Sequence, residues 1–284
     1  MARGLVLGAL VLPILALLAA PIQGKLQRLF RAQPALIWFL PPIFTAVFIG
    51  ASLLLGVVYL PLFLLVLAYT VAPVLCVLRQ ADFLAVLFLW LPIEFAAGGA
   101  WVPQAARGFL HSVAYGIAIL LGLALFLCFR SIPEMKYRLP RSVGDLWMPL
   151  LAFGITAPIL AVTGIGIGFI PPPHLPAAGW SRMAVAAALI FVGTALPEEI
   201  LFRSLIQNLL MKRFGAGWPI LLLSAVIFGA AHLDNGPQPL PNWRYMILAT
   251  IAGLAYGKVF QRSSTVTSSA LLHAMVDFTK HFFF

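Results

Sequence analysis

The chain has 284 residues, of which 62% are hydrophobic and 9% are charged, and its mean hydropathy is +1.03. These values exclude an ordinary soluble domain and indicate a polytopic membrane protein. The formal charge of +10 does not indicate a nucleic-acid-binding protein, because Lys and Arg occur singly or in small groups between apolar runs, as topology signals do.

Apolar runs of bilayer-spanning length predict an all-α, polytopic transmembrane helix bundle of about 8–10 spans. Breaks at charges and at Pro/Gly clusters place ten candidate spans near residues 4–22, 35–55, 57–78, 84–99, 108–129, 148–170, 183–210, 217–233, 244–261 and 265–283. The first could instead be a signal peptide, and the fourth is short enough to be re-entrant.

The basic residues between the spans predict an orientation. Strict alternation places most Lys and Arg residues on the side of the loop that holds Lys25 and Arg31, and the positive-inside rule makes that side cytoplasmic. His232 would then lie toward the outer face. The loop 234–243 would cover a site there from outside.

Ionisable residues within the spans are concentrated late in the chain. Before about residue 145 the spans contain only Glu94 and His111. The last four spans contain Glu198, Glu199, Arg203, His232, His273 and Asp277. We therefore predict a membrane-embedded helical region of unknown role at 1–145 and a chemically active helical bundle at 146–284.

The motif LPEEILFR at 196–203 places three charges in an apolar run. An ionisable side chain at mid-bilayer costs about 2.5–3.5 kcal/mol, so partners or water are expected. Glu199 and Arg203 share a helix face and should pair, whereas Glu198 is turned away by about 100° and would be available for chemistry. Pro197 lacks a backbone N–H, which predicts a loosened turn before it. The alternative, a helix end with snorkelling charges, fits less well because the apolar run resumes after Arg203.

Two further pairs have the same four-residue spacing. Phe228 and His232 share a face near the end of an apolar run, where a lone histidine would ordinarily be a capping or packing residue. His273 and Asp277 share a face in the last span, so the carboxylate could orient the imidazole. Polar pairs within apolar helices favour a functional interpretation.

Ala249, Gly253 and Gly257 also recur at four-residue spacing. Small residues in this pattern let two helices approach closely in a membrane. We expect ordinary bundle packing along this face.

These groups can support two hydrolytic chemistries. In the first, Glu198 is the general base for a water held by His232, while His273 and Asp277 stabilise the oxyanion. In the second, His232, His273 and carboxylates bind zinc or another divalent ion. The absence of an HExxH motif weakens the second scheme, and no G-x-S-x-G motif supports a serine nucleophile.

Taken in order, the motifs resemble those of the CPBP family of intramembrane proteases, which includes the Rce1-like type II CAAX prenyl endopeptidases and bacterial bacteriocin-processing or immunity proteins. The resemblance rests on E-E-x-x-x-R, F-x-x-x-H and H-x-x-x-N/D, and it covers roughly residues 183–280. The matching residues are Glu198, Glu199, Arg203, Phe228, His232, His273 and Asp277.

The resemblance implies a glutamate-dependent, metal-free endopeptidase. Glu198 and His232 would activate water, and His273 and Asp277 would form the oxyanion site. Glu199 and Arg203 would hold the helices together. No cofactor is implied. Asp277 is a departure, because the CAAX branch has Asn there and an ionised Asp cannot donate to an oxyanion. We therefore expect Asp277 to orient His273.

The expected partner is a membrane-anchored protein or peptide, cleaved in a C-terminal segment that is presented at the bilayer. The expected location is the inner membrane of a prokaryotic cell, with no nucleic acid bound. Oligomeric state is not indicated. Two other classes share some of these features: a non-catalytic bacteriocin-immunity protein and a proton-coupled transporter. The first would tolerate Glu198→Gln, and the second would conduct protons.

Overall fold

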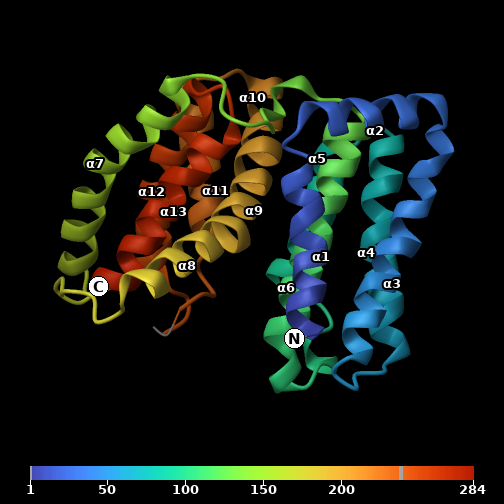
Figure 1. The fold of residues 1–284 in the computed structure, drawn as a ribbon, viewed down its shortest axis with the longest axis horizontal. Helices are drawn as coiled ribbons and strands as arrows, with labels where there is room; N and C mark the ends of the chain where they lie inside the picture. Colours follow the sequence, from blue (N-terminus) through green and yellow to red (C-terminus); the bar gives the residue numbers. More distant parts are fainter. Residues whose placement is uncertain (1, 237–238) are drawn as a thin grey trace. The chain divides into compact units, whose positions relative to one another are not determined.

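The computed structural model describes residues 2–236 and 239–284, and the regular elements of these residues are all helices (Figure 1). The prediction of an all-α, polytopic helix bundle is confirmed. Backbone contacts divide the chain into two compact units, Met1–Glu134 and Met135–Phe284. We describe each unit by itself.

The described residues of the first unit form six α-helices. They are α1 (Ala2–Ala16), α2 (Ala20–Ala32), α3 (Leu40–Leu53), α4 (Leu60–Leu78), α5 (Asp82–Glu94) and α6 (Gln104–Gly122), which continues as a π-helix, Leu123–Phe129. Short 3-10 helices lie at Pro34–Phe39, Gly99–Trp101 and Pro133–Met135. Within this unit α4 packs on α3 and α5, and α1 packs on α6.

The expected first span, 4–22, is not one straight helix. Its segment breaks between α1 and α2, which meet at 92°. Pro21 stands in the first turn of α2, where its missing N–H and fixed φ are tolerated, rather than in a helix interior. The α2 helix also carries Lys25, Arg28 and Arg31, so it does not continue the apolar run.

Within the described residues, six helical segments are long and apolar enough to cross a membrane, or seven if the bent α1–α2 pair is counted as one span. This number is below the ten expected. The α11 helix is apolar but short, while α12 and α13 form where expected and are too polar to qualify by hydropathy. Many of their polar side chains face protein rather than lipid.

The second unit is built around one long helical segment. This segment, Trp180–Phe214, runs through α8 (Trp180–Ile190), a π-helix (Phe191–Ala195), α9 (Leu196–Glu199), a second π-helix (Ile200–Gln207) and α10 (Asn208–Phe214). The other helices are α7 (Val143–Gly166), α11 (Trp218–Ala230), α12 (Trp243–Arg262) and α13 (Val266–Phe283). Helix α13 contacts α7, α8, α9 and α12, so it is the central helix of this unit (Figure 1).

The loosened turn expected before Pro197 is present as the π-helix Phe191–Ala195. A proline cannot donate its backbone hydrogen bond, and a wider turn accommodates the interrupted ladder. Such π-turns inside α-helices often mark functional sites. The second π-helix, Ile200–Gln207, carries Arg203.

The turn between α12 and α13 is held by charged side chains. The ammonium of Lys136 donates to the carbonyls of Phe260, Gln261 and Ser263 at 2.7, 3.1 and 2.9 Å, which caps the end of α12. The Asp145 carboxylate accepts from the backbone N–H and the hydroxyl of Ser264 at 2.7 and 2.6 Å. One ammonium and one carboxylate therefore hold the connection between α12 and α13.

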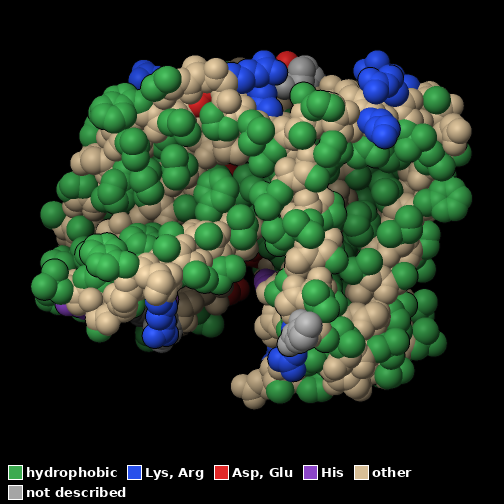
Figure 2. All heavy atoms as spheres, in the orientation of Figure 1, with side chains coloured by type: hydrophobic (Ala, Val, Ile, Leu, Met, Phe, Trp, Pro, Cys, Tyr) green, Lys and Arg blue, Asp and Glu red, His purple; other side chains and the backbone are tan. Residues whose placement is uncertain are grey.

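Small residues allow α11 and α12 to approach closely, as the four-residue spacing predicted. A Cβ added to Gly253 would lie 3.2 Å from the Cα of Ala225, and one added to Gly257 would lie 2.6 Å from a Leu221 methyl carbon. The approach is closer still at Gly229 on α11, where an added Cβ would lie 2.0 Å from the hydroxyl oxygen of Thr250. The outer faces of α7 and α8 are covered by apolar side chains, as lipid contact requires (Figure 2).

Candidate active site

Glu199 and Arg203 form the ion pair expected from their spacing. Arg203 Nε donates to Glu199 Oε2 at 3.1 Å, and both side chains are fully buried at 0% exposure. The guanidinium also donates to Gln207 Oε1 at 3.4 Å and lies 4.9 Å from the centre of the Phe228 ring. Breaking a buried pair leaves an uncompensated charge, so this contact fixes the helix arrangement.

His273 lies where three carboxylates meet. Its Nδ1 is 3.1 Å from Glu199 Oε1, while its Nε2 is 3.4 Å from Asp277 Oδ2 and 3.8 Å from Glu198 Oε2. Each ring nitrogen thus faces a carboxylate, and both can donate only when the ring carries two protons. The structure brings together Glu198, His273 and Asp277, which sequence reasoning had placed in one site.

The two neighbouring glutamates differ in burial. Glu199 is sealed inside the helix packing, whereas the Glu198 side chain is 23% exposed and that of Asp277 is 30% exposed. Ser269 donates to Glu199 Oε2 through its hydroxyl, and this oxygen also accepts from Arg203. The geometry therefore gives Glu199 a structural position and leaves part of the Glu198 side chain exposed, while its oxygen nearest His273, Oε2, is buried.

His232 follows the last turn of α11, and its contacts determine its tautomer. Its Nδ1 lies 2.8 Å from the carbonyl oxygen of Phe228, which can only accept, so Nδ1 carries the proton. In the neutral ring Nε2 then has a lone pair that can accept a hydrogen bond. The ring is held between Phe228 and Tyr245, with centroid distances of 4.8 and 4.6 Å.

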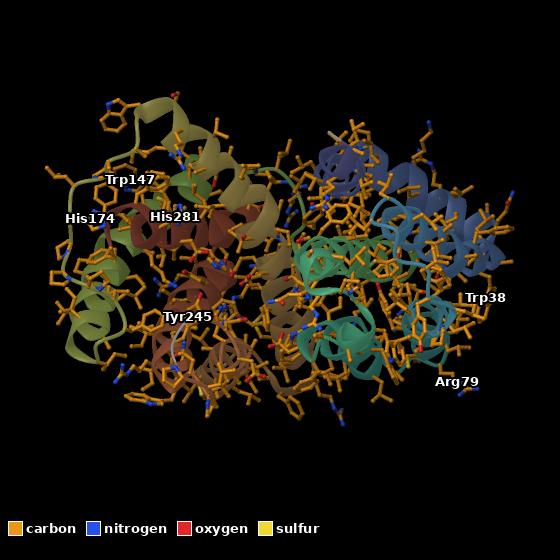
Figure 3. The ribbon with its side chains drawn as sticks, turned by 90° about the horizontal axis from the view of Figure 1, so that it is seen from below. Trp38, Arg79, Trp147, His174, Tyr245 and His281 are labelled. Carbon is orange, nitrogen blue, oxygen red and sulfur yellow. The ribbon has the colours of Figure 1, made fainter. Side chains whose placement is uncertain are left out.

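A cavity of about 80 Å³ lies among α7, α11, α12 and α13. His232, His273 and Asp277 all line it, and most of the remaining lining is apolar or aromatic. Its volume and polar partners are sufficient for water. Figure 3 shows nitrogen and oxygen atoms gathered between the helices of this unit, with Tyr245 inside the bundle and Trp147 on its outer surface.

A wider cleft of about 530 Å³ lies between α8 and α13. Its apolar wall is formed by Ala186, Leu189 and Ile190 of α8. Tyr245, Asp277 and Lys280 border this cleft and the inner cavity as well. The cleft therefore leads to the carboxylate of Asp277 and offers a path for an extended segment.

Sequence reasoning missed several residues of the site. The Tyr256 ring stacks on His273 at 4.6 Å and 18°, and Tyr245 lies beside both His232 and the Lys280 ammonium, which is 4.2 Å from its ring centre. Tyr245, Ala249, Ala252 and Tyr256 follow a helical period along α12. That period is the sequence signal for these aromatic residues, whereas the prediction for this helix rests on its small residues alone.

The loop expected to cover the site includes Pro237 and Gln238, which lie outside the described residues. Asn242 holds the end of this loop that leads into α12. The Asn242 side chain accepts from the N–H of Tyr245 at 3.1 Å and donates to the carbonyl of Asn235 at 2.8 Å. These bonds begin α12 and fix the backbone beside Tyr245.

Metal binding needs several His, Cys, Asp or Glu ligands that converge on one point. Within the described residues no group of three or more such side chains is arranged to hold a metal ion. Each imidazole of the site also uses Nδ1 for a protein hydrogen bond, so only the Nε2 atoms remain as candidate ligands. A chelator can test the zinc scheme.

Comparison with known protein families gives a match in the C-terminal part of the chain. Residues 180–279 match the family model described as type II CAAX prenyl endopeptidase Rce1-like. The matched segment runs from the start of α8 into the last turns of α13, and it includes all seven residues assigned from the motifs. No curated protein and no solved structure matches the chain.

Proposed function

We propose that this chain, whose residues 180–279 belong to the Rce1-like family of endopeptidases, uses Glu198 as the general base of a metal-free peptide hydrolysis. Family membership makes it a membrane protease, and its apolar helices make it a multi-pass membrane protein. To this we add the catalytic residues and the class of substrate. The proposal rests chiefly on the 3.8 Å distance between Glu198 Oε2 and His273 Nε2, which joins the motif on α9 to the motif on α13.

The attacking water would be oriented by two acceptors. One hydrogen would be donated to the Nε2 lone pair of His232, and the other would pass to the carboxylate of Glu198 as the water oxygen attacks the peptide carbon. The tautomer imposed by the Phe228 carbonyl supports this role of His232. The hydrogen bond that the water donates to His232 would keep a lone pair of the water oxygen directed at the peptide carbon of the substrate.

The same attack moves an electron pair onto the carbonyl oxygen of the substrate. His273, whose Nδ1 is bonded to Glu199, would donate from Nε2 to that oxyanion. The 3.4 Å contact between Nε2 and Asp277 is longer than an ordinary N–H···O bond, so this N–H can be shared with a substrate. When the C–N bond breaks, Glu198 would return its proton to the leaving amine.

The substrate we propose is a membrane-anchored protein, lipidated or held by a transmembrane helix, whose C-terminal segment enters the cleft between α8 and α13. The apolar side chains of α8 would contact the segment, and the Lys280 ammonium offers a counter-charge for a carboxylate. We place the enzyme in the inner membrane of a prokaryotic cell, because its motifs resemble those of bacterial members of the wider CPBP family.

Purified full-length protein, incubated with prenylated and unprenylated membrane-anchored peptides in ¹⁸O-labelled water, tests the proposal. Wild type should add one ¹⁸O atom to the new carboxylate, with or without a chelator. Glu198→Gln should lose this activity. Glu134→Gln, an identical change at an exposed position, should keep it.

Three results would contradict the scheme. Cleavage that survives in Glu198→Gln would show that Glu198 is not the general base. Loss of cleavage with a chelator would restore the metal scheme. If wild type cleaved no peptide of the panel and Glu198→Gln kept the biological phenotype of wild type, a non-catalytic immunity function would be favoured.

A further inference from the structure

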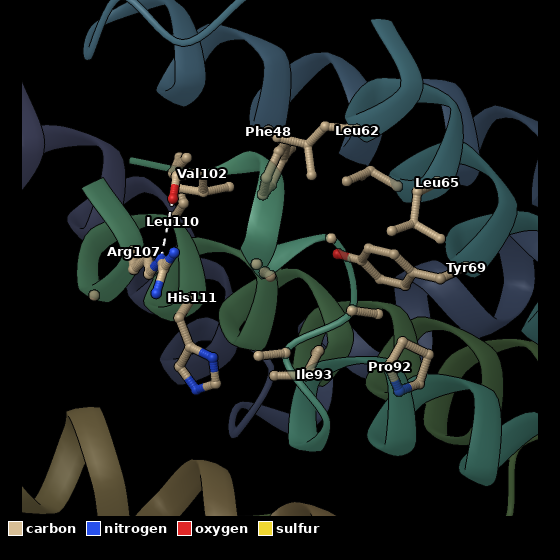
Figure 4. Close-up of a pocket in the computed structure, with 17 residues that line it drawn as sticks. Phe48, Leu62, Leu65, Tyr69, Pro92, Ile93, Val102, Arg107, Leu110 and His111 are labelled. Carbon is tan, nitrogen blue, oxygen red and sulfur yellow. Dashed lines mark hydrogen bonds between the residues drawn. The ribbon is translucent and has the colours of Figure 1, made fainter. Parts of the chain in front are cut away.

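The first unit contains a separate cavity that the protease site does not use. It measures about 310 Å³ and lies among α3, α4, α5, α6 and the loop that joins α5 to α6 (Figure 4). Its walls are mostly apolar and include Phe48, Leu62, Leu65 and Ile93. A cavity of this size and lining is typical of a small-molecule site.

One polar atom inside this cavity has no partner. Tyr69 on α4 is buried, with 6% of its surface exposed, and its hydroxyl has no hydrogen-bond partner among the described residues. Figure 4 shows the hydroxyl pointing into the cavity. Because buried polar groups are nearly always hydrogen-bonded, this orphan hydroxyl indicates an occupant with a complementary oxygen.

A guanidinium and an imidazole lie at the edge of the same cavity. Arg107 and His111 are one turn apart at the start of α6, and both are exposed. Arg107 Nε donates to the carbonyl of Val102 at 3.0 Å, which directs the guanidinium without using its terminal nitrogens. The span of α6 begins at Gln104, so this arginine lies where a membrane helix meets the headgroup layer.

The loop between α5 and α6 forms one wall of the cavity and packs tightly against α4. Gly98 has a φ of +77°, and a Cβ there would come within 2.9 Å of Leu65 and 3.0 Å of Leu62. Only glycine adopts this backbone readily with so little space. The close fit between loop and leucines makes the wall a defined surface.

We propose that this cavity binds a lipid with an anionic head. One hydrocarbon chain fills the apolar part, a carbonyl oxygen of the lipid accepts from the Tyr69 hydroxyl, and Arg107 with His111 binds the phosphate or carboxylate. Charge and polarity both favour this occupant: the walls are apolar, the Tyr69 hydroxyl can donate from within, and the mouth carries the positive charge of Arg107 beside the His111 imidazole. The proposal is independent of the protease activity.

Photocrosslinking of the purified full-length protein tests the site. Three probes carry a diazirine on the same chain: a fatty acid, a phosphatidylglycerol and the fatty acid methyl ester. Both anionic probes, or one of them, should label peptides of α3 to α6. A preference between them tells whether the ligand is a phospholipid or a free fatty acid.

A matched pair of substitutions on α4 separates the cavity from the outer surface. Leu65→Trp fills the cavity and should lower labelling about tenfold, equivalent to ~1.4 kcal/mol. Leu64→Trp, at the exposed neighbouring position, should not. Equal labelling of the two variants, or labelling spread over all helices, would overturn the proposal.

Two milder variants test the polar contacts if Leu65→Trp fails to fold. Tyr69→Phe removes one oxygen atom and should weaken labelling by all three probes about fivefold, the effect of one hydrogen bond. Arg107→Gln should weaken labelling by the two anionic probes and spare the methyl ester. Unchanged labelling in both variants would show that the cavity does not recognise a lipid in this way.

Discussion

The Nδ1 atom of His273 lies 3.1 Å from Oε1 of Glu199, and this contact joins the motif on α9 to the motif on α13. The second oxygen of the same carboxylate accepts from Arg203 at 3.1 Å. Glu199 therefore connects the ion pair to the imidazole. The neighbouring Glu198 approaches the opposite nitrogen of that imidazole, so two adjacent glutamates hold one histidine in two different ways.

The two glutamates should respond differently to the same substitution. Glu199→Gln removes the counter-charge of a fully buried arginine, which should destabilise the fold by about 3–5 kcal/mol. Its thermal unfolding midpoint in detergent should fall by several degrees. Glu198→Gln should leave the midpoint close to wild type while hydrolysis is lost. An unchanged midpoint in Glu199→Gln would contradict the structural assignment.

Asp277 should tolerate replacement by asparagine better than by alanine. Asparagine keeps an oxygen near Nε2 of His273, where Asp277 now lies at 3.4 Å, whereas alanine leaves that side of the ring without a partner. The loss of one hydrogen bond to a charged group, ~1.5 kcal/mol, predicts a decrease in kcat of about tenfold in Asp277→Ala. Peptide cleavage assays measure it. Equal rates in the two variants would mean that this contact does not position the imidazole.

Replacing His232 should impair the reaction and leave the fold intact. In His232→Asn the side-chain amide can still donate to the Phe228 carbonyl, but the acceptor at Nε2 is gone. We expect kcat/KM to fall by about 10²–10⁴, the usual contribution of a positioned acid or base, with little change in thermal midpoint. His174→Asn, in an exposed loop, is the control. Wild-type rates in His232→Asn would exclude its role in holding water.

Helical periodicity was sufficient to predict contacts within one helix. The Glu199–Arg203 pair and the contact between the Phe228 and His232 rings both follow from a four-residue spacing, and the structure contains both. The loosened turn before Pro197 followed from the missing N–H of proline. Each of these features is local, so no knowledge of the tertiary arrangement was needed.

Contacts between helices could not be predicted in the same way. Asp277 was expected to orient His273 because both lie on α13, yet the Nδ1 partner is Glu199 from another helix. The spacing of residues says which side chains share a face but not which faces meet. The number of spans differs for another reason: α12 and α13 form at two of the expected spans but fall short in hydropathy, and α11 falls short in length.

Two glycine substitutions should have opposite effects on stability. A Cβ at Gly257 would lie 2.6 Å from Gln207 Oε1, the atom that accepts from Arg203, so Gly257→Ala should displace Gln207 and lower the thermal midpoint. The cost expected for overpacking is about 1–3 kcal/mol. Gly154→Ala faces open space on α7 and should stabilise its helix by about 0.5–1 kcal/mol. Thermal unfolding curves of the two variants, measured under the same conditions, give the two midpoints. A midpoint for Gly257→Ala at or above that of Gly154→Ala would show that Gln207 does not hold the ion pair in place.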